Sequence, residues 1–133
     1  DAEWDTFLGA LVPFNQSWAS KASVLIYVIS DMILESHGAR NPSHSHSFDA
    51  GAAWMALALQ AHSMGLVSHG MTGVDFEAAA KAVNLPEGFR IEAAIALGYP
   101  GDAGTLPEAL QAREVPSGRR PLGETLFRGA IPS

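Results

Sequence analysis

One segment constrains the fold of this chain more than any other, because nearly all of its side chains are apolar. Between Ala50 and Met64 only a few polar residues interrupt the apolar run, and Asp49 before it is a typical N-cap residue. Gly65 follows as the expected C′ residue. A helix that is apolar on most faces must be covered on most faces. The sequence therefore predicts a central helix packed against a sheet, a second subunit or both.

The residues after this helix are predicted to form a glycine-containing loop. The loop ends before a short helix that begins at Asp75, and it comprises Ser68, His69, Gly70, Met71, Thr72 and Gly73. Two glycines beside a buried helix can bring backbone N–H groups close to a flat or anionic ligand. The alternative interpretation is that the loop only connects two helices.

Length and charge limit the function classes. A chain of 133 residues is one domain's worth of sequence. Its formal net charge of −6 argues against nucleic acid as a main partner. The absence of cysteine excludes disulfides, thiolate nucleophiles and cysteine zinc sites, so redox chemistry would need a cofactor. The longest apolar segment is shorter than the roughly 20 residues of a membrane span, which predicts a soluble protein with no membrane partner.

The remaining elements follow from periodicity. A helical stripe of Trp4, Phe7, Leu8 and Leu11 precedes Pro13. Residues 23–30 are continuously apolar and β-branched, as expected for an interior strand covered on both faces, and residues 91–97 form a second predicted strand. Residues 31–47 lose periodicity and are predicted to be a long loop.

The connections suggest how these strands pair. The connection between the two strands contains helix, which favours a parallel pair. Two strands cannot cover the central helix, so further strands are expected from a missing segment, the tail or a partner chain. From Gly101 onward, Pro, Gly and charged residues accumulate, and the chain is predicted to be irregular or extended.

Three polar motifs are candidate functional sites. His44 and His46, with His37 nearby, could suggest a metal site, but this spacing in a loop without a clear third ligand is weak evidence. Ser68 lies in G-x-x-S-x-G, whereas the nucleophile elbow of hydrolases is G-x-S-x-G, so a serine hydrolase is disfavoured.

Arg119 and Arg120 are the third motif, an adjacent basic pair in an acidic chain. They are either a clamp for a phosphate group or part of a solvated tail.

Taken together, the motifs resemble the nitroreductase family of FMN-dependent oxidoreductases. The matching blocks are FNQSWASKASVLIYVIS, FDAGAAWMALALQAHSMGLVSHGMTGVD, LPEGFRIEAAIALGYPGD and GRRPLGETLF, of which the second and third are the specific ones. The resemblance implies an α+β fold with a central sheet flanked by helices. It also implies a homodimer intertwined through the central helices, with FMN at the interface.

The same resemblance implies the site residues. The segment from Ser68 to Gly73 would contact the cofactor, with the N–H groups of Thr72 and Gly73 directed at N5 and O4 of the flavin. Arg119 or Arg120 would contact the FMN phosphate. Donors near N5 and O4 would stabilise the charge that develops on flavin reduction, so no side chain is assigned as a general acid or base.

The sequence departs from the family pattern at its N-terminal end. The arginine- and serine-containing phosphate-binding helix of the family has no counterpart, so residues 1–133 are interpreted as a single, N-terminally incomplete domain. The predicted function is a cytoplasmic oxidoreductase that uses NAD(P)H and FMN to reduce a nitroaromatic, quinone or similar small-molecule acceptor. The alternative is a non-catalytic flavin-binding or dimerisation module.

Overall fold

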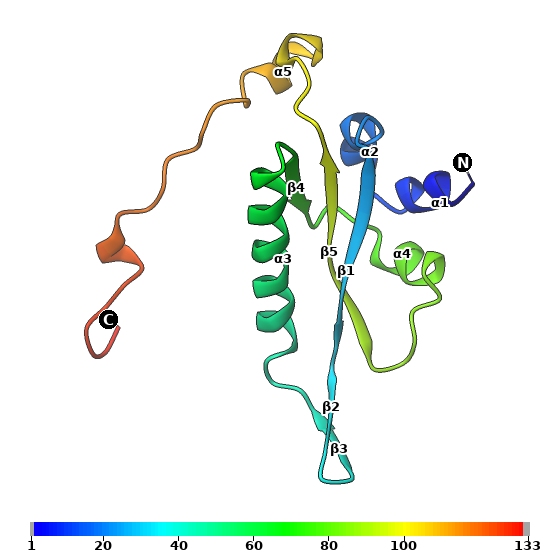
Figure 1. Cartoon of the computed structure of the whole chain (residues 1–133), viewed down its shortest axis with the longest axis vertical. Helices are drawn as coiled ribbons and strands as arrows, with labels where there is room; N and C mark the ends of the chain where they lie inside the picture. The colour runs from blue at the N-terminus through cyan, green and yellow to red at the C-terminus, as the bar shows by residue number, and fades with distance from the viewer. Residues whose placement is uncertain (1, 132–133) are drawn as a thin grey trace. The chain divides into compact units, whose positions relative to one another are not determined.

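The computed structural model describes residues 2–131, which fall into two compact units that divide between Pro100 and Gly101. The first unit is an α+β arrangement of a three-stranded sheet, a two-stranded hairpin and four helices (Figure 1). No helix among the described residues is both long enough and apolar enough to cross a membrane.

Two short helices open the chain. Helix α1 spans Ala2–Gly9, as its apolar stripe predicts, and α2 spans Pro13–Ala19 with proline in its first turn. Proline is favoured there because its missing N–H would have no partner inside the helix. The two helices lie on the same side of the sheet in Figure 1.

The three-stranded sheet has the order β1-β5-β4 and is antiparallel throughout. Its strands are β1 (Val24–Asp31), β4 (Val67–Met71) and β5 (Phe89–Gly98). The predicted parallel pairing of the first and last strands is wrong. A helix in a connection does not by itself set strand direction, because the short helix before β5 leads the chain back beside β4 in the opposite sense.

The position of β1 also differs from the prediction. Both of its faces contact helices, α1 on one side and α3 (His46–Ser63) on the other, as its continuous apolar run indicates. However, β1 is an edge strand of the described sheet, with β5 in the centre. Apolar composition reports coverage of the two faces and carries little information on how many strand neighbours there are.

The predicted loop over residues 31–47 contains regular structure. Strands β2 (Ile33–Ser36) and β3 (Ala39–Pro42) form an antiparallel hairpin that extends beyond the end of β1. The turn places His37 at φ 53° and Gly38 at φ 76°. Two successive positive φ values are typical of the tight hairpin turns that match strand twist. The sequence does not indicate strand β3, because every side chain of β3 is exposed and the strand contains asparagine and proline.

The central helix is confirmed, with a different start. Helix α3 begins at His46, its N-cap is Ser45, and Asp49 lies in its first turn, where it accepts a hydrogen bond from Ser45 Oγ at 2.7 Å. A carboxylate in the first turn stabilises the helix through the macrodipole, which explains why Asp49 looked like the cap. The helix ends as predicted, with Gly65 at φ 77°.

The predicted loop over residues 68–73 is also partly wrong, since Ser68 to Met71 belong to strand β4. This strand supplies the third member of the sheet, which the sequence analysis expected from a missing segment, the tail or a partner chain. The short helix after it is confirmed as α4 (Phe76–Ala82), capped by Asp75, whose Oδ1 accepts from Ala78 N at 3.0 Å.

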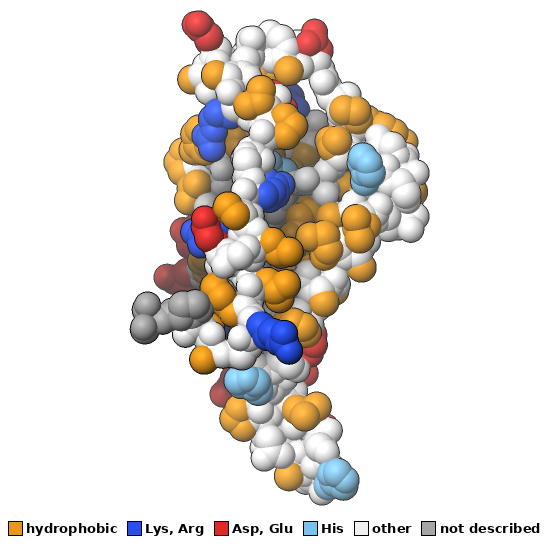
Figure 2. Space-filling model, turned by 90° about the vertical axis from the view of Figure 1, so that its left-hand side faces the viewer, with side chains coloured by type: hydrophobic (Ala, Val, Ile, Leu, Met, Phe, Trp, Pro, Cys, Tyr) orange, Lys and Arg blue, Asp and Glu red, His pale blue; other side chains and the backbone are white. Residues whose placement is uncertain are grey.

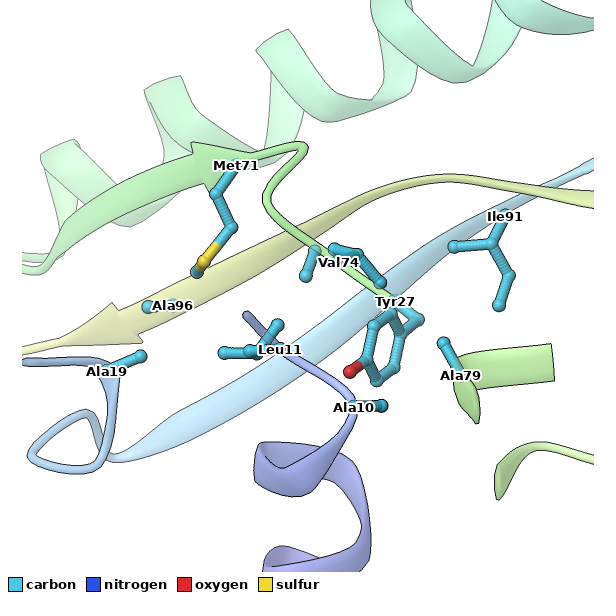
Figure 3. Close-up of a cluster of buried hydrophobic side chains, with 10 residues drawn as sticks. Ala10, Leu11, Ala19, Tyr27, Met71, Val74, Ala79, Ile91 and Ala96 are labelled. Carbon is cyan, nitrogen blue, oxygen red and sulfur yellow. The ribbon is translucent and has the colours of Figure 1, made fainter. Parts of the chain in front are cut away.

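The core lies between the sheet and helices α1, α2 and α4 (Figure 3). Tyr27 on β1 points into it, and its hydroxyl donates to the Phe7 carbonyl at 2.8 Å. Burial raises the pKa of Tyr27 to about 12, so the hydroxyl stays protonated and keeps this bond. The buried apolar members of the cluster are Ala10, Leu11, Ala19, Tyr27, Met71, Val74, Ala79, Ile91, Ala94 and Ala96.

The second unit is largely irregular, as predicted. It contains two 3-10 turns, η1 (Ala103–Thr105) and η2 (Leu122–Glu124), and a single helical turn, α5 (Glu108–Gln111). None of its described residues is buried.

Candidate functional site

Strand β4 divides the predicted binding residues between the two faces of the sheet. Met71 joins the core on the α2 side, and the exposed imidazole of His69 lies 4.7 Å from the Trp18 ring of α2, centroid to centroid. Gly70 faces α3, because a Cβ at this position would lie 3.1 Å from Trp54 Cζ2. These side chains therefore do not gather at one point.

Ser68 lies inside this strand and is half-buried. A hydrolase nucleophile sits on a sharp turn between a strand and a helix, which exposes its hydroxyl. The position of Ser68 within a regular strand agrees with the absence of the elbow motif.

The residues that follow β4 are held in place by the start of α2. The carbonyl of Gly73 accepts two hydrogen bonds, from Val12 N at 3.1 Å and from Asn15 Nδ2 at 3.0 Å. One residue on, Val74 bridges to Leu11 in antiparallel fashion. The segment Thr72–Val74 is thus fixed by contacts with residues about sixty positions earlier, and sequence reasoning did not find this role of Asn15.

Position 73 is occupied by glycine for a steric reason. A Cβ built on Gly73 would overlap Asn15 Nδ2 and would lie 3.0 Å from Val12 Cγ2. Its φ is not among the positive values of the described chain. The close approach of α2, and not an unusual backbone angle, therefore excludes a side chain.

The N–H groups of Thr72 and Gly73 remain as donors for a ligand. Within residues 2–131, neither amide donates a hydrogen bond to any group outside the β4–β5 ladder, which ends at Met71. Thr72 is exposed and Gly73 is half-buried. Backbone amides with free donors in a rigid segment suit an acceptor-rich ligand edge.

Arg119 and Arg120 lie in the second unit, and both side chains are exposed. Arg119 Nη1 donates to Ser117 Oγ at 2.7 Å and to the Ser117 carbonyl at 3.0 Å. These contacts are local, so the guanidinium groups have donors left for an anion.

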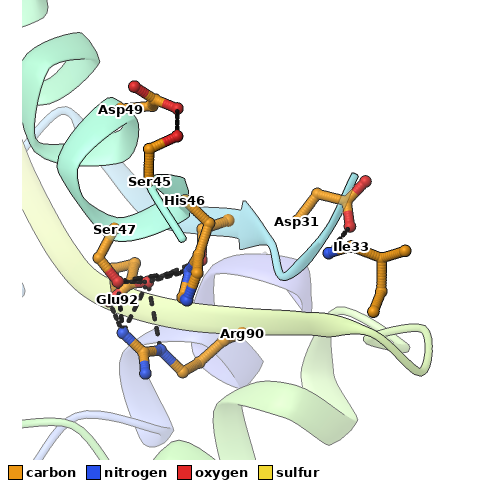
Figure 4. Close-up of polar contacts among 9 residues, drawn as sticks. Asp31, Ile33, Ser45, His46, Ser47, Asp49, Arg90 and Glu92 are labelled. Atoms are coloured by element: carbon orange, nitrogen blue, oxygen red, sulfur yellow. Dashed lines mark hydrogen bonds and ion pairs between the residues drawn. The ribbon is translucent and has the colours of Figure 1, made fainter. Parts of the chain in front are cut away.

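A polar cluster that the sequence analysis did not identify joins α3 to the sheet (Figure 4). We call it the Glu92 cluster, and its members are Ser30, His46, Ser47, Arg90 and Glu92. Glu92 Oε1 accepts from Ser30 Oγ at 2.6 Å and from Ser47 Oγ at 2.9 Å, and Arg90 Nη2 lies 2.8 Å from Glu92 Oε2. The hydrogen bond from Arg90, with those from Ser30 and Ser47, lowers the pKa of Glu92 to about 2.

The Glu92 cluster accounts for one of the histidines considered as metal ligands. His46 Nδ1 lies 2.9 Å from Ser30 Oγ and 3.3 Å from Glu92 Oε1. His37 contacts Ser36 Oγ in the hairpin turn at 2.8 Å, and His44 precedes α3. The signal that could have revealed the cluster is a single glutamate within the apolar run IEAAIAL.

Comparison with known proteins identifies the family. The family model described as the nitroreductase family matches residues 2–99, which is most of the chain and all of its sheet. The chain belongs to the nitroreductase family. The α+β fold implied by the sequence motifs is therefore confirmed.

Several relatives of this nitroreductase-family chain are informative. A protein of Mycolicibacterium smegmatis, named only as an uncharacterized 15.4 kDa protein in the ask 5′ region, is 39% identical over 97% of this chain and 86% of its own length. A crystal structure described as the oxidoreductase containing FMN is 44% identical with a TM-score of 0.94, over 99% of this chain and 67% of that chain.

Two further structures extend the comparison. A crystal structure from Desulfovibrio desulfuricans, described as a nitroreductase candidate in complex with FMN, is 25% identical with a TM-score of 0.62 over 99% of this chain and 68% of its own. A nitroreductase family protein from Streptococcus pneumoniae is 19% identical with a TM-score of 0.68, covers 96% of this chain and 74% of its own, and supports the fold alone.

Proposed function

We propose that this chain is an FMN-dependent oxidoreductase that uses NAD(P)H as reductant and a nitroaromatic, quinone or similar small molecule as acceptor. The observation that carries the proposal is the pair of free N–H donors at Thr72 and Gly73, in a segment fixed by Val12 and Asn15. Similarity to structures whose descriptions name FMN supports the choice of cofactor.

The donor set fits a flavin. Hydride transfer between NAD(P)H and the acceptor is the chemistry that bound FMN supplies. The amides of Thr72 and Gly73 would donate to the N5 and O4 edge of the ring, where negative charge increases on reduction. Ser68 to Met71 would contribute by holding this segment at the end of β4.

We assign Arg119 and Arg120 to the phosphate of FMN. Their exposed guanidinium groups suit a dianion, because each can donate two parallel hydrogen bonds. The exposed face of α3 would complete the site by pairing two copies of the chain.

The homodimer proposal rests on that face. Phe48, Met55 and Leu59 occur at helical spacing on α3 and are 78%, 55% and 64% exposed. Hydrophobic side chains are among those exposed on the face of the molecule drawn in Figure 2. A second copy of α3 would remove this apolar surface from water, and a two-fold arrangement uses the same face of both subunits.

The function is tested by reconstitution and reduction of the purified protein. We expect FMN to bind with quenching of its fluorescence, and NADH or NADPH to bleach its visible absorption under anaerobic conditions. Bleached protein should regain colour when a quinone or nitroaromatic compound is added. Retained FMN that neither nucleotide bleaches would favour the non-catalytic module, and no FMN binding would refute the proposal.

A further inference from the structure

We infer that Asn15 is a positioning residue for the Gly73 amide, one of the two proposed to contact the flavin. The inference rests on the proposed function and adds to it a residue from the start of α2. Asn15 is buried, with 8% of its surface exposed, and it reaches a carbonyl 58 positions further along the chain. A buried amide needs a hydrogen-bond partner, and Gly73 provides one.

Two donors from one turn of α2 converge on the Gly73 carbonyl. Val12 N approaches it from the N-cap and Asn15 Nδ2 approaches it from the first turn, at 3.1 Å and 3.0 Å. Together they fix the plane of the peptide between Gly73 and Val74.

A third hydrogen bond fixes the preceding peptide. Val74 N donates to the Thr72 carbonyl at 2.9 Å. In a trans peptide the C=O and N–H point in opposite directions, so fixing the Thr72 carbonyl also fixes the direction of the Gly73 N–H. Both peptide planes that include Gly73 are therefore held, and one of the restraints is a side chain that can be replaced.

The packing of Asn15 against Gly73 strengthens the coupling. The Asn15 amide occupies the space that a side chain at position 73 would need. A change at either residue therefore moves the backbone of the other. The direction of the donors determines how well they stabilise the reduced flavin, so Asn15 acts on the cofactor through Gly73.

The test uses Asn15→Asp and Asn15→Ala, with Gln16→Ala as the matched control. Asn15→Asp keeps the shape but places a carboxylate oxygen against the Gly73 carbonyl, and Asn15→Ala removes the donor. Gln16 also belongs to α2 and bonds a backbone carbonyl, that of Leu11 at 2.6 Å, but it does not contact Gly73. Circular dichroism verifies folding of each variant.

The first readout needs no cofactor. In the flavin-free protein, both Asn15 variants should shift the NMR amide resonances of Thr72 and Gly73, whereas Gln16→Ala should leave them in place. The second readout is the bound flavin. We expect FMN affinity to fall roughly three- to tenfold in Asn15→Ala, the equivalent of one hydrogen bond. The reduction potential of bound FMN should also become more negative, because misdirected donors stabilise the reduced form less.

A double variant keeps the inference testable if the single substitutions unfold the protein. Gly73→Ala should be harmful alone and less harmful in combination with Asn15→Ala, since removal of the amide makes room for the new methyl group. Folded Asn15 variants with wild-type potential and affinity would overturn the inference and leave the proposed function intact. A wild-type protein that binds no FMN would overturn both.

Discussion

Gly70 on β4 packs closely against the indole of Trp54 on α3. A Cβ at this glycine would come within 3.1 Å of Trp54 Cζ2 and 3.2 Å of Cε2, closer than side chains normally pack. We predict that Gly70→Ala lowers the free energy of unfolding by about 1–3 kcal/mol, the usual cost of overpacking. Urea unfolding followed by tryptophan fluorescence measures this change.

Gly9→Ala is the matched control for that substitution. No atom lies within 4 Å of a Cβ built on Gly9, and its φ is not in the left-handed region. Its free energy of unfolding should stay within about 0.5 kcal/mol of wild type. Equal destabilisation by the two substitutions would contradict the role of the Trp54 contact.

If the exposed face of α3 forms the proposed dimer interface, a charged side chain introduced there should dissociate the dimer. Leu59→Glu would bury a carboxylate in an apolar interface, so the variant should elute as a monomer where wild type elutes as a dimer. Leu34→Glu is the control, because Leu34 is 56% exposed on β2, away from α3. Light scattering coupled to size exclusion gives the masses, and a monomeric wild type at micromolar concentration would refute the dimer.

Arg119 and Arg120 should distinguish FMN from riboflavin. Replacing both with Ala should weaken FMN binding roughly tenfold to a hundredfold, as expected for the loss of a charge-assisted hydrogen bond, and should affect riboflavin less. Fluorescence titration with each flavin measures both affinities. The same loss of affinity for both flavins would indicate misfolding. No loss of affinity would indicate that the two arginines are only part of a solvated tail.

Thr72 should act through its backbone. Thr72→Pro removes an N–H donor and fixes φ, whereas Thr72→Ala keeps the donor. We expect Thr72→Pro to lose far more of the rate of flavin bleaching by NAD(P)H, or of flavin retention, than Thr72→Ala does. Stopped-flow absorbance provides the rates, with circular dichroism as the folding control. The reverse order would make the hydroxyl the active group.

The lowered pKa of Glu92 predicts how the free energy of unfolding depends on pH. Its pKa falls from 4.5 to about 2 on folding, so ionised Glu92 stabilises the fold above about pH 4.5. That contribution is lost as the pH falls from 4.5 toward 2. We expect Glu92→Gln to cost on the order of 1–2 kcal/mol at pH 7, less than the full shift implies, because solvent screens the exposed Arg90.

The measurement is urea unfolding of wild type and Glu92→Gln from pH 7 down to pH 3. The difference between their free energies of unfolding should narrow below about pH 4.5. Glu77→Gln removes only an exposed pair with Lys81 and should cost at most about 0.5 kcal/mol at pH 7. A constant difference for Glu92→Gln across this range would contradict the assignment.

Elements with a strong periodic pattern were predictable from the sequence. The central helix, the apolar strands β1 and β5, and the Asp75 cap of α4 were all identified because local composition determines them. The family, and with it the fold class, followed from four sequence motifs, of which the block that contains the central helix and the block LPEGFRIEAAIALGYPGD are the specific ones.

Elements whose stability comes from distant contacts were not predictable. Strand β4 reads as a loop, because its glycine and serine have low strand propensity, and only the indole of Trp54 explains Gly70. The role of Asn15 depends in the same way on Gly73, and the Glu92 cluster joins residues from two strands and a helix. In each case the tertiary fold brings together residues that are far apart in the sequence, so a short stretch of sequence does not reveal the contact.

The register between β1 and β5 shows how the Glu92 cluster is accommodated in the sheet. Val28 pairs with Ala93 and Ile29 pairs with Ile91, so Glu92 is an extra residue that bulges from the ladder. Deleting it would join the two halves into a regular ladder, with Ile91 and Ala94 still on the core face. In evolutionary terms, this sheet can gain or lose its partly buried carboxylate by a single insertion or deletion, without any shift in the pairing of its other residues.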